Sequence, residues 1–359
     1  GLPPRIFTGT SNAWLYALQA AKASITVWGI WLGHVYHWHI VTAAMQMTMY
    51  NRLPAGHRLR PLLEPQSQFL IDFDYILLKV VWDRLAPPTP VDGPTSLLKL
   101  LDRFASGREF FDDDPPTALR HHGLDPADFT VDPDEPWDAY PAVGLLLGIW
   151  NITYKYVETV VDNLYPNDNE VASDTGLKAW MDASRDPSQG NVRGLPEMNT
   201  RDDLIAVLTS LLYRVTAHGA ASLSPSVNPV MSFVANFPPC LQSAEVPEPS
   251  AELSLSELLD LLPHTGTLGG MTTFYYTFAY TSPDAPLIPA EGVDKEPQFE
   301  PPYENCNPAL VAYRSDIQEF IVRYEKTWNK ALAQIRGHDA ELPPYAHGQD
   351  QQWPRSIEI

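Results

Sequence analysis

The chain has 359 residues, 44% hydrophobic and 11% aromatic, which is typical of a globular protein and excludes a largely disordered one. A formal net charge of −20, from 44 acidic against 24 basic residues, disfavours binding to nucleic acid and to anionic membranes. No apolar run reaches the roughly 18 uninterrupted residues that predict a membrane-spanning helix.

The first half of the chain predicts long buried helices followed by a loop-rich stretch. Residues 12–50 are rich in Ala, Trp, Leu and Met, with apolar side chains on nearly every face of a helix. We expect two long helices there, or one interrupted run, ending at residues 53–57. Residues 69–85 predict a further helix. Prolines and the acidic run at 112–114 predict loops and short helices over 87–141.

The second half predicts more helices with readable start signals. Helices are expected at 141–164, at 204–221 after the polar residues 199–203, and at 307–335. The segment Ser254-Leu255-Ser256-Glu257 predicts a capping box before a short helix. The tail from residue 343 is expected to be extended.

Helical patterns dominate and strand patterns are scarce, so we expect a mainly α fold with few strands. No repeat or shift of composition divides the chain, and one domain over residues 1–359 is expected. The two cysteines, Cys240 and Cys306, are too few for a disulfide framework, and they could pair or stay as buried thiols. Compartment and oligomeric state are left open.

The chain ends on a β-branched apolar residue, Ile359, in the sequence Pro354-Arg355-Ser356-Ile357-Glu358-Ile359. Charged or flexible residues are usual at a C-terminus. An apolar end is favourable when it is buried, and a buried carboxylate needs a cation or metal as its partner. The ending therefore predicts a positive centre inside the protein.

Histidines on two apolar helices are candidates for binding that centre as a metal ion. His34, His37 and His39 lie within six residues, and His218 lies near the end of a later helix. In an α-helix, His34 and His39 diverge by about 140°, whereas a π-bulge brings residues five apart back to one face. The alternative reading is that these histidines are ordinary core residues, which histidine on an apolar face often is.

Four separated segments match, in order, the motifs of one enzyme family. They are residues 14–22 (WLYALQAAK), His34-x4-His39 followed by His57, His218-x3-Ser222, and the six-residue ending at Ile359. With these motifs the chain resembles the lipoxygenases. The likeness runs from about residue 12 to the end, except for residues 87–138, which do not align with the family.

The resemblance implies a non-heme iron centre, with manganese as the alternative metal. The implied ligands are His34, His39, His218, Ser222 and the terminal carboxylate of Ile359. Ser222 takes the place of a weak ligand, and a water is expected between its hydroxyl and the iron. The three histidines and the terminal carboxylate are also the expected catalytic centre. His37 and His57 are expected to be structural or supporting residues.

The resemblance also implies a helical catalytic domain whose central, π-bulged helix binds the iron. The implied enzyme is an oxidoreductase of lipid metabolism, a dioxygenase that removes hydrogen from a doubly allylic methylene and adds O2 to form a hydroperoxide, an oxylipin. Its partners are an unsaturated lipid, or a lipid-like molecule, and dioxygen. Trp38, Leu77, Leu223 and Phe237 are expected pocket residues. Leu77 falls at a position that is usually Ala or Gly in the family and that controls where oxygen enters.

The chain departs from the family in ways that leave the substrate open. The N-terminal β-barrel and most helices before residue 12 are absent, so a shortened or processed form is expected. Arg58, Arg60 and Arg214 are expected in solvated surface pairs rather than at a substrate carboxylate. Two alternatives remain: a lipoxygenase-fold enzyme acting on a hydroperoxide or a non-fatty-acid unsaturated intermediate, and a non-catalytic, metal-stabilised binding protein.

Overall fold

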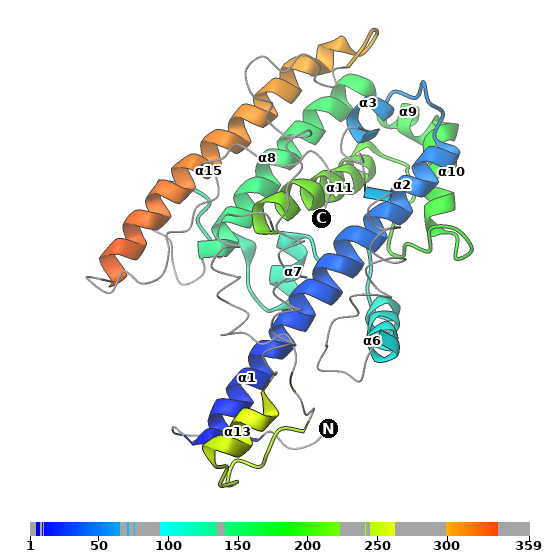
Figure 1. Ribbon diagram of the computed structural model, residues 1–359. Coiled ribbons are helices and arrows are strands. Elements are labelled where there is room, and N and C mark those ends of the chain that lie inside the picture. Colours follow the sequence, from blue (N-terminus) through cyan, green and yellow to red (C-terminus); the bar gives the residue numbers. More distant parts are fainter. Residues whose placement is uncertain are drawn as a thin grey trace. The chain divides into compact units, whose positions relative to one another are not determined.

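The computed structural model describes residues 5–7, 9, 11–64, 70–71, 75, 94–134, 141–222, 241, 245–262 and 299–336. Within these ranges the regular structure is helical and contains no strand, which confirms the predicted mainly α fold (Figure 1). No helix in these ranges combines the length and the apolar character needed to cross a membrane.

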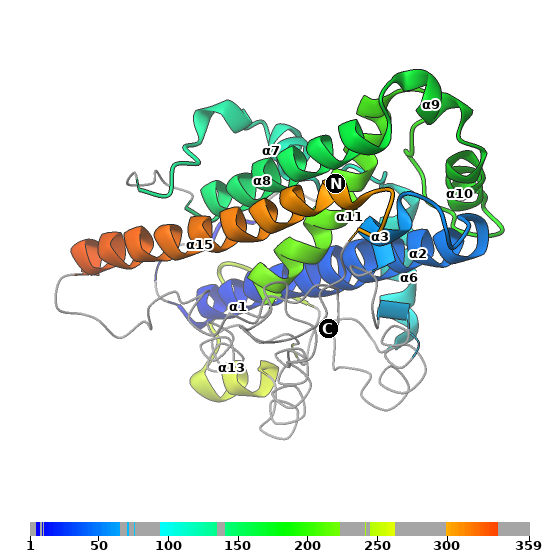
Figure 2. The ribbon, with the colours of Figure 1, turned by 90° about the horizontal axis from the view of Figure 1, so that it is seen from above.

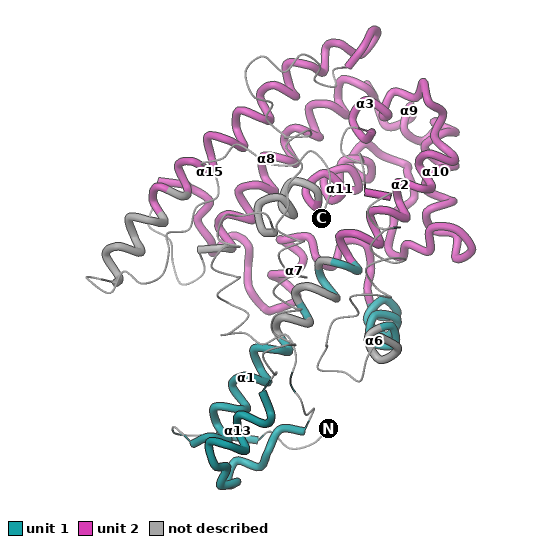
Figure 3. Tube along the Cα trace, viewed as in Figure 1, with its two compact units in different colours: residues 1–36, 75–107, 227–279 teal, residues 37–74, 108–226, 280–359 magenta. Residues whose placement is uncertain are grey.

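Contacts divide the chain into two compact units, coloured separately in Figure 3. The first unit consists of residues 1–36, 75–107 and 227–279, and the second of residues 37–74, 108–226 and 280–359. Compactness does not by itself show independent folding, so the expectation of a single domain stays a prediction.

A helical run starts at Asn12 and continues to Arg52. It consists of α1 (Asn12–Thr26), the π-helix η1 (Val27–Ile40) and α2 (Val41–Arg52). The sequence predicts two helices or one interrupted run here. The interruption is a change of hydrogen-bonding pattern over 14 residues.

In the first unit, α1 packs against the short helix α13 (Leu255–Leu261). The predicted capping box is confirmed at the start of α13. The Glu257 N–H donates to the Ser254 hydroxyl at 3.2 Å, and the Ser254 N–H donates to the Glu257 carboxylate at 2.8 Å. Asn12 donates from Nδ2 to the Leu253 carbonyl at 2.7 Å, which ties the start of α1 to the same turn.

An aromatic cluster joins α6 (Pro94–Ser106) to residues 27–36 of η1, which belong to this unit. The Phe104 ring stands edge-on to Trp28 at 6.1 Å and to Tyr36 at 5.6 Å between ring centroids. Edge-to-face packing at these separations is favourable for aromatic rings, so α6 covers one face of the π-helix.

In the second unit, α8 (Pro141–Leu164) packs against several helices and α10 (Thr175–Arg185) packs against α2. The other described elements of this unit are α3 (Arg60–Leu63), α7 (Pro115–His121), η4 (Pro126–Asp128), α9 (Asp168–Ser173), α11 (Arg201–Ser222), η5 (Glu304–Cys306) and α15 (Asn307–Arg336). α8 packs against both α11 and α15, and Figures 1 and 2 show α15 running alongside α8.

The contact between α8 and α15 is close. The Phe320 ring of α15 lies where a Cβ on Gly148 of α8 would be, and Tyr156 of α8 stacks on Tyr313 of α15 with 4.4 Å between ring centroids. Glycine thus permits the close approach of the two helices.

Most predicted helices are confirmed. The helices expected at 141–164, 204–221 and 307–335 correspond to α8, α11 and α15. Most of residues 69–85 and all of the tail from 343 lie outside the described residues. The loop-rich stretch contains the short helices α7 and η4 as expected, together with the 13-residue α6.

Two short helices of the second unit were not predicted, and the structure decides between the two readings of Cys306. Helices α9 and α10 begin at the caps Asn167 and Asp174, whose side chains accept from the N–H groups of Glu170 and Leu177. Cys306 is a buried free thiol, and burial raises its pKa to about 11, so it is protonated and unreactive near neutral pH. Cys240 lies outside the described residues.

Candidate functional site

The π-helix η1 carries three of the histidines singled out from the sequence. Its hydrogen bonds link residues five apart, which adds about one residue to each turn. His34 and His39 therefore return to a similar face of the helix, as the expected π-bulge requires. The prediction of a central π-bulged helix is confirmed.

The structure describes the predicted metal ligands to different extents. His39 is fully buried, with 0% of its surface exposed. His34, His218 and Ser222 have described backbone positions, on η1 and on the last turns of α11, but their side chains are not among the described ones. Ile359 lies outside the described residues. Among the described side chains, no group of three or more His, Cys, Asp or Glu is arranged to bind a metal, so the ligand set stays a prediction.

The predicted pocket residues are described only at Trp38. This side chain is half-buried and packs against Ala43 and Leu70, which form a small buried cluster in the second unit. The other three pocket residues, Leu77, Leu223 and Phe237, lie outside the described residues. The structure thus describes Trp38 as part of an apolar wall and leaves the pocket itself a prediction.

The residues named from the sequence offer donor atoms, imidazole nitrogen and carboxylate oxygen, that suit a non-heme metal. Imidazole and carboxylate ligands with open positions suit iron and manganese. Two observations support this fit: the π-helix gives His34 and His39 the required register, and His39 is buried, away from water that would compete for a ligand position.

His37 is buried against the carboxylate of Asp113. Its Nδ1 is 2.9 Å from the Asp113 carboxylate, and only 1% of the residue is exposed. The two groups are not aligned as a hydrogen bond, so the contact is electrostatic. Burial lowers the pKa of His37, and the charge of Arg214 lowers it further. His37 is thus neutral at physiological pH.

His57 belongs to a separate network that fixes the start of α10. Its Nδ1 accepts the Leu59 N–H at 3.2 Å, so Nε2 bears the proton and donates to Asp174 at 3.0 Å. Asp174 also accepts from the Tyr165 hydroxyl at 2.8 Å and from the Leu177 N–H at 3.0 Å. Burial alone would raise the pKa of Asp174, but these donors outweigh it and hold that pKa well below its ordinary value.

Beside this network lies an open hollow of about 550 Å³. It is lined by Pro54, Gly56, His57, Arg58, Glu170, Ser173, Asp174, Thr175, Gly176 and Tyr303. The His57 ring has both nitrogens engaged and the Asp174 carboxylate accepts three donors, so these groups stabilise the fold rather than stand ready for catalysis. The expectation of a structural role for His57 agrees with this geometry.

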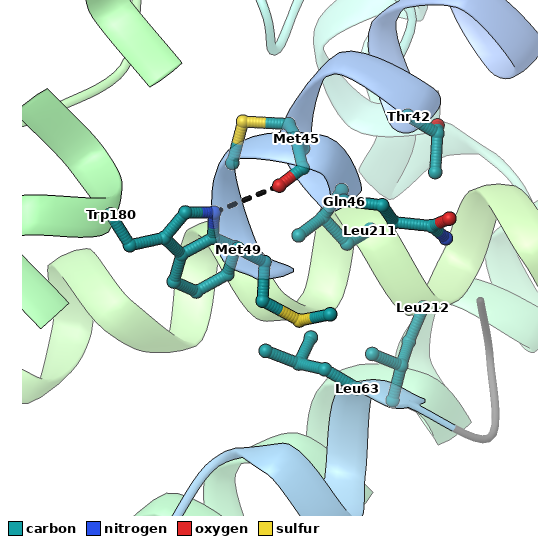
Figure 4. Close-up of a pocket in the computed structure, with 8 residues that line it drawn as sticks. All are labelled: Thr42, Met45, Gln46, Met49, Leu63, Trp180, Leu211 and Leu212. Carbon is teal, nitrogen blue, oxygen red and sulfur yellow. Dashed lines mark hydrogen bonds between the residues drawn. The ribbon is translucent and has the colours of Figure 1, made fainter. Parts of the chain in front are cut away.

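A small internal cavity of about 20 Å³ lies next to α2 in the second unit (Figure 4). It is lined by Thr42, Met45, Gln46, Met49, Leu63, Trp180, Leu211 and Leu212. The Thr42 hydroxyl and the Gln46 carbonyl oxygen are buried and make no hydrogen bond within the described part of the chain. The cavity is large enough for about one water molecule and too small for a lipid.

Two of the three arginines considered for a substrate carboxylate are buried, so their expected place in solvated surface pairs is wrong. Arg60 is 5% exposed and donates to the Leu53 carbonyl at 2.7 Å. Arg214 is 1% exposed, donates to the Phe110 carbonyl and lies 4.2 Å from the Phe110 ring centroid. Arg58 forms a partly exposed pair with Glu170 at 3.0 Å, and Arg60 also pairs with the half-exposed Glu64 at 2.8 Å. The partner of Arg214 comes from a distant segment, so its burial could not be read from the sequence.

Comparison with known proteins finds one family. The lipoxygenase family model matches residues 137–272. A curated relative, Lipoxygenase 3, chloroplastic, from Arabidopsis thaliana, is 26% identical over 250 residues, covering 65% of this chain and 26% of its own length. Manganese lipoxygenase from Pleurotus sapidus is 24% identical over 259 residues, covering 70% of this chain and 39% of its own.

Solved structures show the same fold. The fungal lipoxygenase from Fusarium graminearum superposes with a TM-score of 0.75 and 19% identity, over 100% of this chain and 59% of that one. The chain thus spans about a quarter to two fifths of these curated relatives and little more than half of this solved one. The resemblance read from the sequence motifs is confirmed.

Proposed function

This chain is related to the lipoxygenases and has the helical fold of their catalytic domain, and from this we propose that it is a non-heme iron dioxygenase. The proposed reaction inserts O2 into a polyunsaturated lipid and yields a hydroperoxide. The observation that carries the proposal is the π-helix η1, which gives His34 and His39 a common face within the lipoxygenase fold.

The proposed metal ligands are the imidazoles of His34, His39 and His218 and the carboxylate of Ile359, with Ser222 in the weak-ligand place. When bound, the metal supplies the redox chemistry for hydrogen abstraction and reaction with dioxygen. The chain holds His39 away from water, and the neighbouring Trp38 packs against Ala43 of α2 and Leu70. Iron is proposed, with manganese as the other metal that the relatives support.

Metal analysis is the first test. The purified wild-type protein should contain close to one equivalent of iron or manganese, measured by plasma mass spectrometry. His39→Ala should lose the metal, whereas His121→Ala should keep it because that histidine is exposed on α7. A protein that binds neither metal after reconstitution would refute the proposal.

Oxygen uptake tests the reaction. Linoleate and arachidonate should give oxygen consumption with matching conjugated-diene absorbance in the wild type and in His121→Ala, and none in His39→Ala. One extra glycine after Ile359 should abolish both signals while the helical circular dichroism is kept. A metal-loaded protein that consumes a fatty-acid hydroperoxide without oxygen uptake would instead favour the rearrangement reaction.

A further inference from the structure

Residues 108–114, which we call the acidic strap, link the π-helix to α11 within the second unit. The strap lies in the part of the sequence that does not align with the lipoxygenase family. It contacts η1 through one carboxylate and α11 through the next one and a backbone carbonyl. Both helices carry proposed metal ligands.

The contact with η1 is made by Asp113. One of its oxygens is 2.9 Å from His37, two positions before His39 on the same helix. The other oxygen is 3.4 Å from Arg108, whose charge helps to balance the carboxylate. Burial would raise the pKa of Asp113, but the neighbouring His37 and the two arginines, Arg108 and Arg214, outweigh it and lower that pKa. The strap thus presents an ionised group to the π-helix.

The contact with α11 is made by Asp114 and Phe110. The Ser210 hydroxyl donates to the Asp114 carboxylate at 2.7 Å, and Arg214 donates to the Phe110 carbonyl while its guanidinium lies over the Phe110 ring. Ser210 and Arg214 are one turn apart on α11, and position 218 follows one turn later. The strap therefore contacts α11 in the two turns that precede position 218, where the proposed ligand lies.

Most groups in these contacts are buried, and the Asp113 side chain is partly buried at 18% exposed, so breaking one of the contacts has a cost. Asp114 is 4% exposed, His37 and Arg214 1%, and Ser210 0%. Leaving a buried charge or acceptor without its partner costs free energy. A displacement of η1 or α11 relative to the strap would break these contacts and is therefore disfavoured.

We propose that Asp113 and Asp114 are positioning residues, which fix η1 and α11 to the strap and thereby hold His39 and His218 for metal binding. As far as it concerns the metal, the proposal rests on the proposed function. It assigns neither carboxylate as a ligand, since both are engaged with other groups.

The test compares three neighbouring carboxylates. Asp113→Ala and Asp114→Ala remove the two contacts. Asp112→Ala is the matched control, because among the described residues the Asp112 carboxylate accepts from the Glu109 N–H inside the strap and contacts neither helix. Affinity for Mn²⁺ is measured on metal-free protein by isothermal titration and by the electron paramagnetic resonance of the bound ion. Asp113→Ala and Asp114→Ala should weaken binding about tenfold or more, as loss of supporting contacts does at other metal sites. Asp112→Ala should change it less than about twofold.

Two further variants separate positioning from simple loss of stability. Asp114→Asn keeps an oxygen to accept from Ser210 and should retain near wild-type affinity, whereas Ser210→Ala should resemble Asp114→Ala. Backbone hydrogen exchange of the metal-free protein supplies the second readout. Asp113→Ala should speed exchange around residues 37–41, and Asp114→Ala around residues 207–214.

The outcomes distinguish this proposal from the proposed function. Unchanged exchange in both helices, or unchanged Mn²⁺ affinity in both alanine variants, would overturn the positioning role even if the wild type is an active dioxygenase. A wild type that binds no metal would refute the proposed function and the metal part of this proposal. The exchange data would then still decide whether the strap fixes the two helices.

Discussion

Trp180 of α10 donates its indole N–H to the carbonyl of Met45 on α2 at 2.9 Å, as Figure 4 shows. The same carbonyl accepts the Thr48 hydroxyl at 2.9 Å, and Thr48 in turn lies 2.7 Å from the Ser184 hydroxyl of α10. Trp180 is 1% exposed. Buried hydrogen bonds and an aromatic ring thus join α10 to the helix that continues directly from η1.

Trp180→Phe should destabilise the second unit while leaving its packing largely intact. The smaller ring fills most of the space, but the hydrogen bond to Met45 is lost, and we expect a cost of about 1–2 kcal/mol. Trp180→Ala also creates a cavity and should cost about 3–5 kcal/mol. Urea unfolding followed by circular dichroism measures both. Equal stability of Trp180→Phe and the wild type would show that the hydrogen bond contributes nothing.

Asp114 should make stability fall as the pH rises toward neutrality. Burial raises its pKa to about 7, against the effect of the nearby Arg214 and Ser210. The folded protein therefore holds a proton that the unfolded chain has released above about pH 4. The ionised groups that face Asp114 are Arg214, Asp113 and Asp112, and Tyr213 of α11 is buried beside it.

The expected result is a loss of unfolding free energy on the order of a few kcal/mol between about pH 4 and pH 7. Asp114→Asn keeps the oxygen that accepts from Ser210 but cannot ionise, so its stability should vary less over this range. Chemical unfolding at several pH values measures the difference. Parallel profiles for the two proteins would contradict the assignment.

Asp174 should show the opposite pH dependence. Its pKa is held below the ordinary value, so its contribution to the free energy of unfolding is present above about pH 4 and is lost as the pH falls further.

Two variants of Asp174 separate the helix cap from the other contacts. Asp174→Ser keeps an oxygen that can cap α10 but removes the contacts with His57 and Tyr165, whereas Asp174→Ala removes the cap as well. We expect Asp174→Ala to be less stable than Asp174→Ser by about 1 kcal/mol. The gap between wild type and Asp174→Ser should narrow below about pH 4. A constant gap would count against the role of the ionised carboxylate.

The cavity beside α2 should hold one ordered water. A crystal structure at high resolution should show it within hydrogen-bonding distance of the Thr42 hydroxyl and the Gln46 carbonyl oxygen, two groups that line the cavity and have no partner among the described residues. Thr42→Val should displace or weaken this water, and Thr42→Ser should keep it. An empty cavity in the wild type would show that the two polar groups remain unsatisfied.

Much of the helical fold follows from short-range sequence signals. The capping box at Ser254 and Glu257 predicts the start of α13, and the long apolar runs predict α8 and α11. The π-helix follows from the spacing of His34 and His39 together with the family resemblance. Helices α9 and α10 are short and polar on one side, so their apolar pattern is weak. Their caps, Asn167 and Asp174, were the available signals.

The supporting contacts of the site could not be read from the sequence. Asp113 and Asp114 lie in an acidic run that predicts a solvated loop, yet Asp114 is buried against Ser210, and Asp113 contacts His37 from a distant part of the chain. Two phenylalanines directly before the run were the only local hint of burial. Long-range pairing depends on how helices pack, which residue spacing does not encode.

The π-helix η1 makes chain length, as well as residue identity, a determinant of this site. If the segment adopted α-helical geometry with its present spacing, His34 and His39 would diverge by about 140°, whereas removing one residue between them would reduce that angle to about 40°. Among related chains we therefore expect this helix to accept many apolar substitutions. The number of residues between the two histidines should change only together with the hydrogen-bonding pattern of the helix.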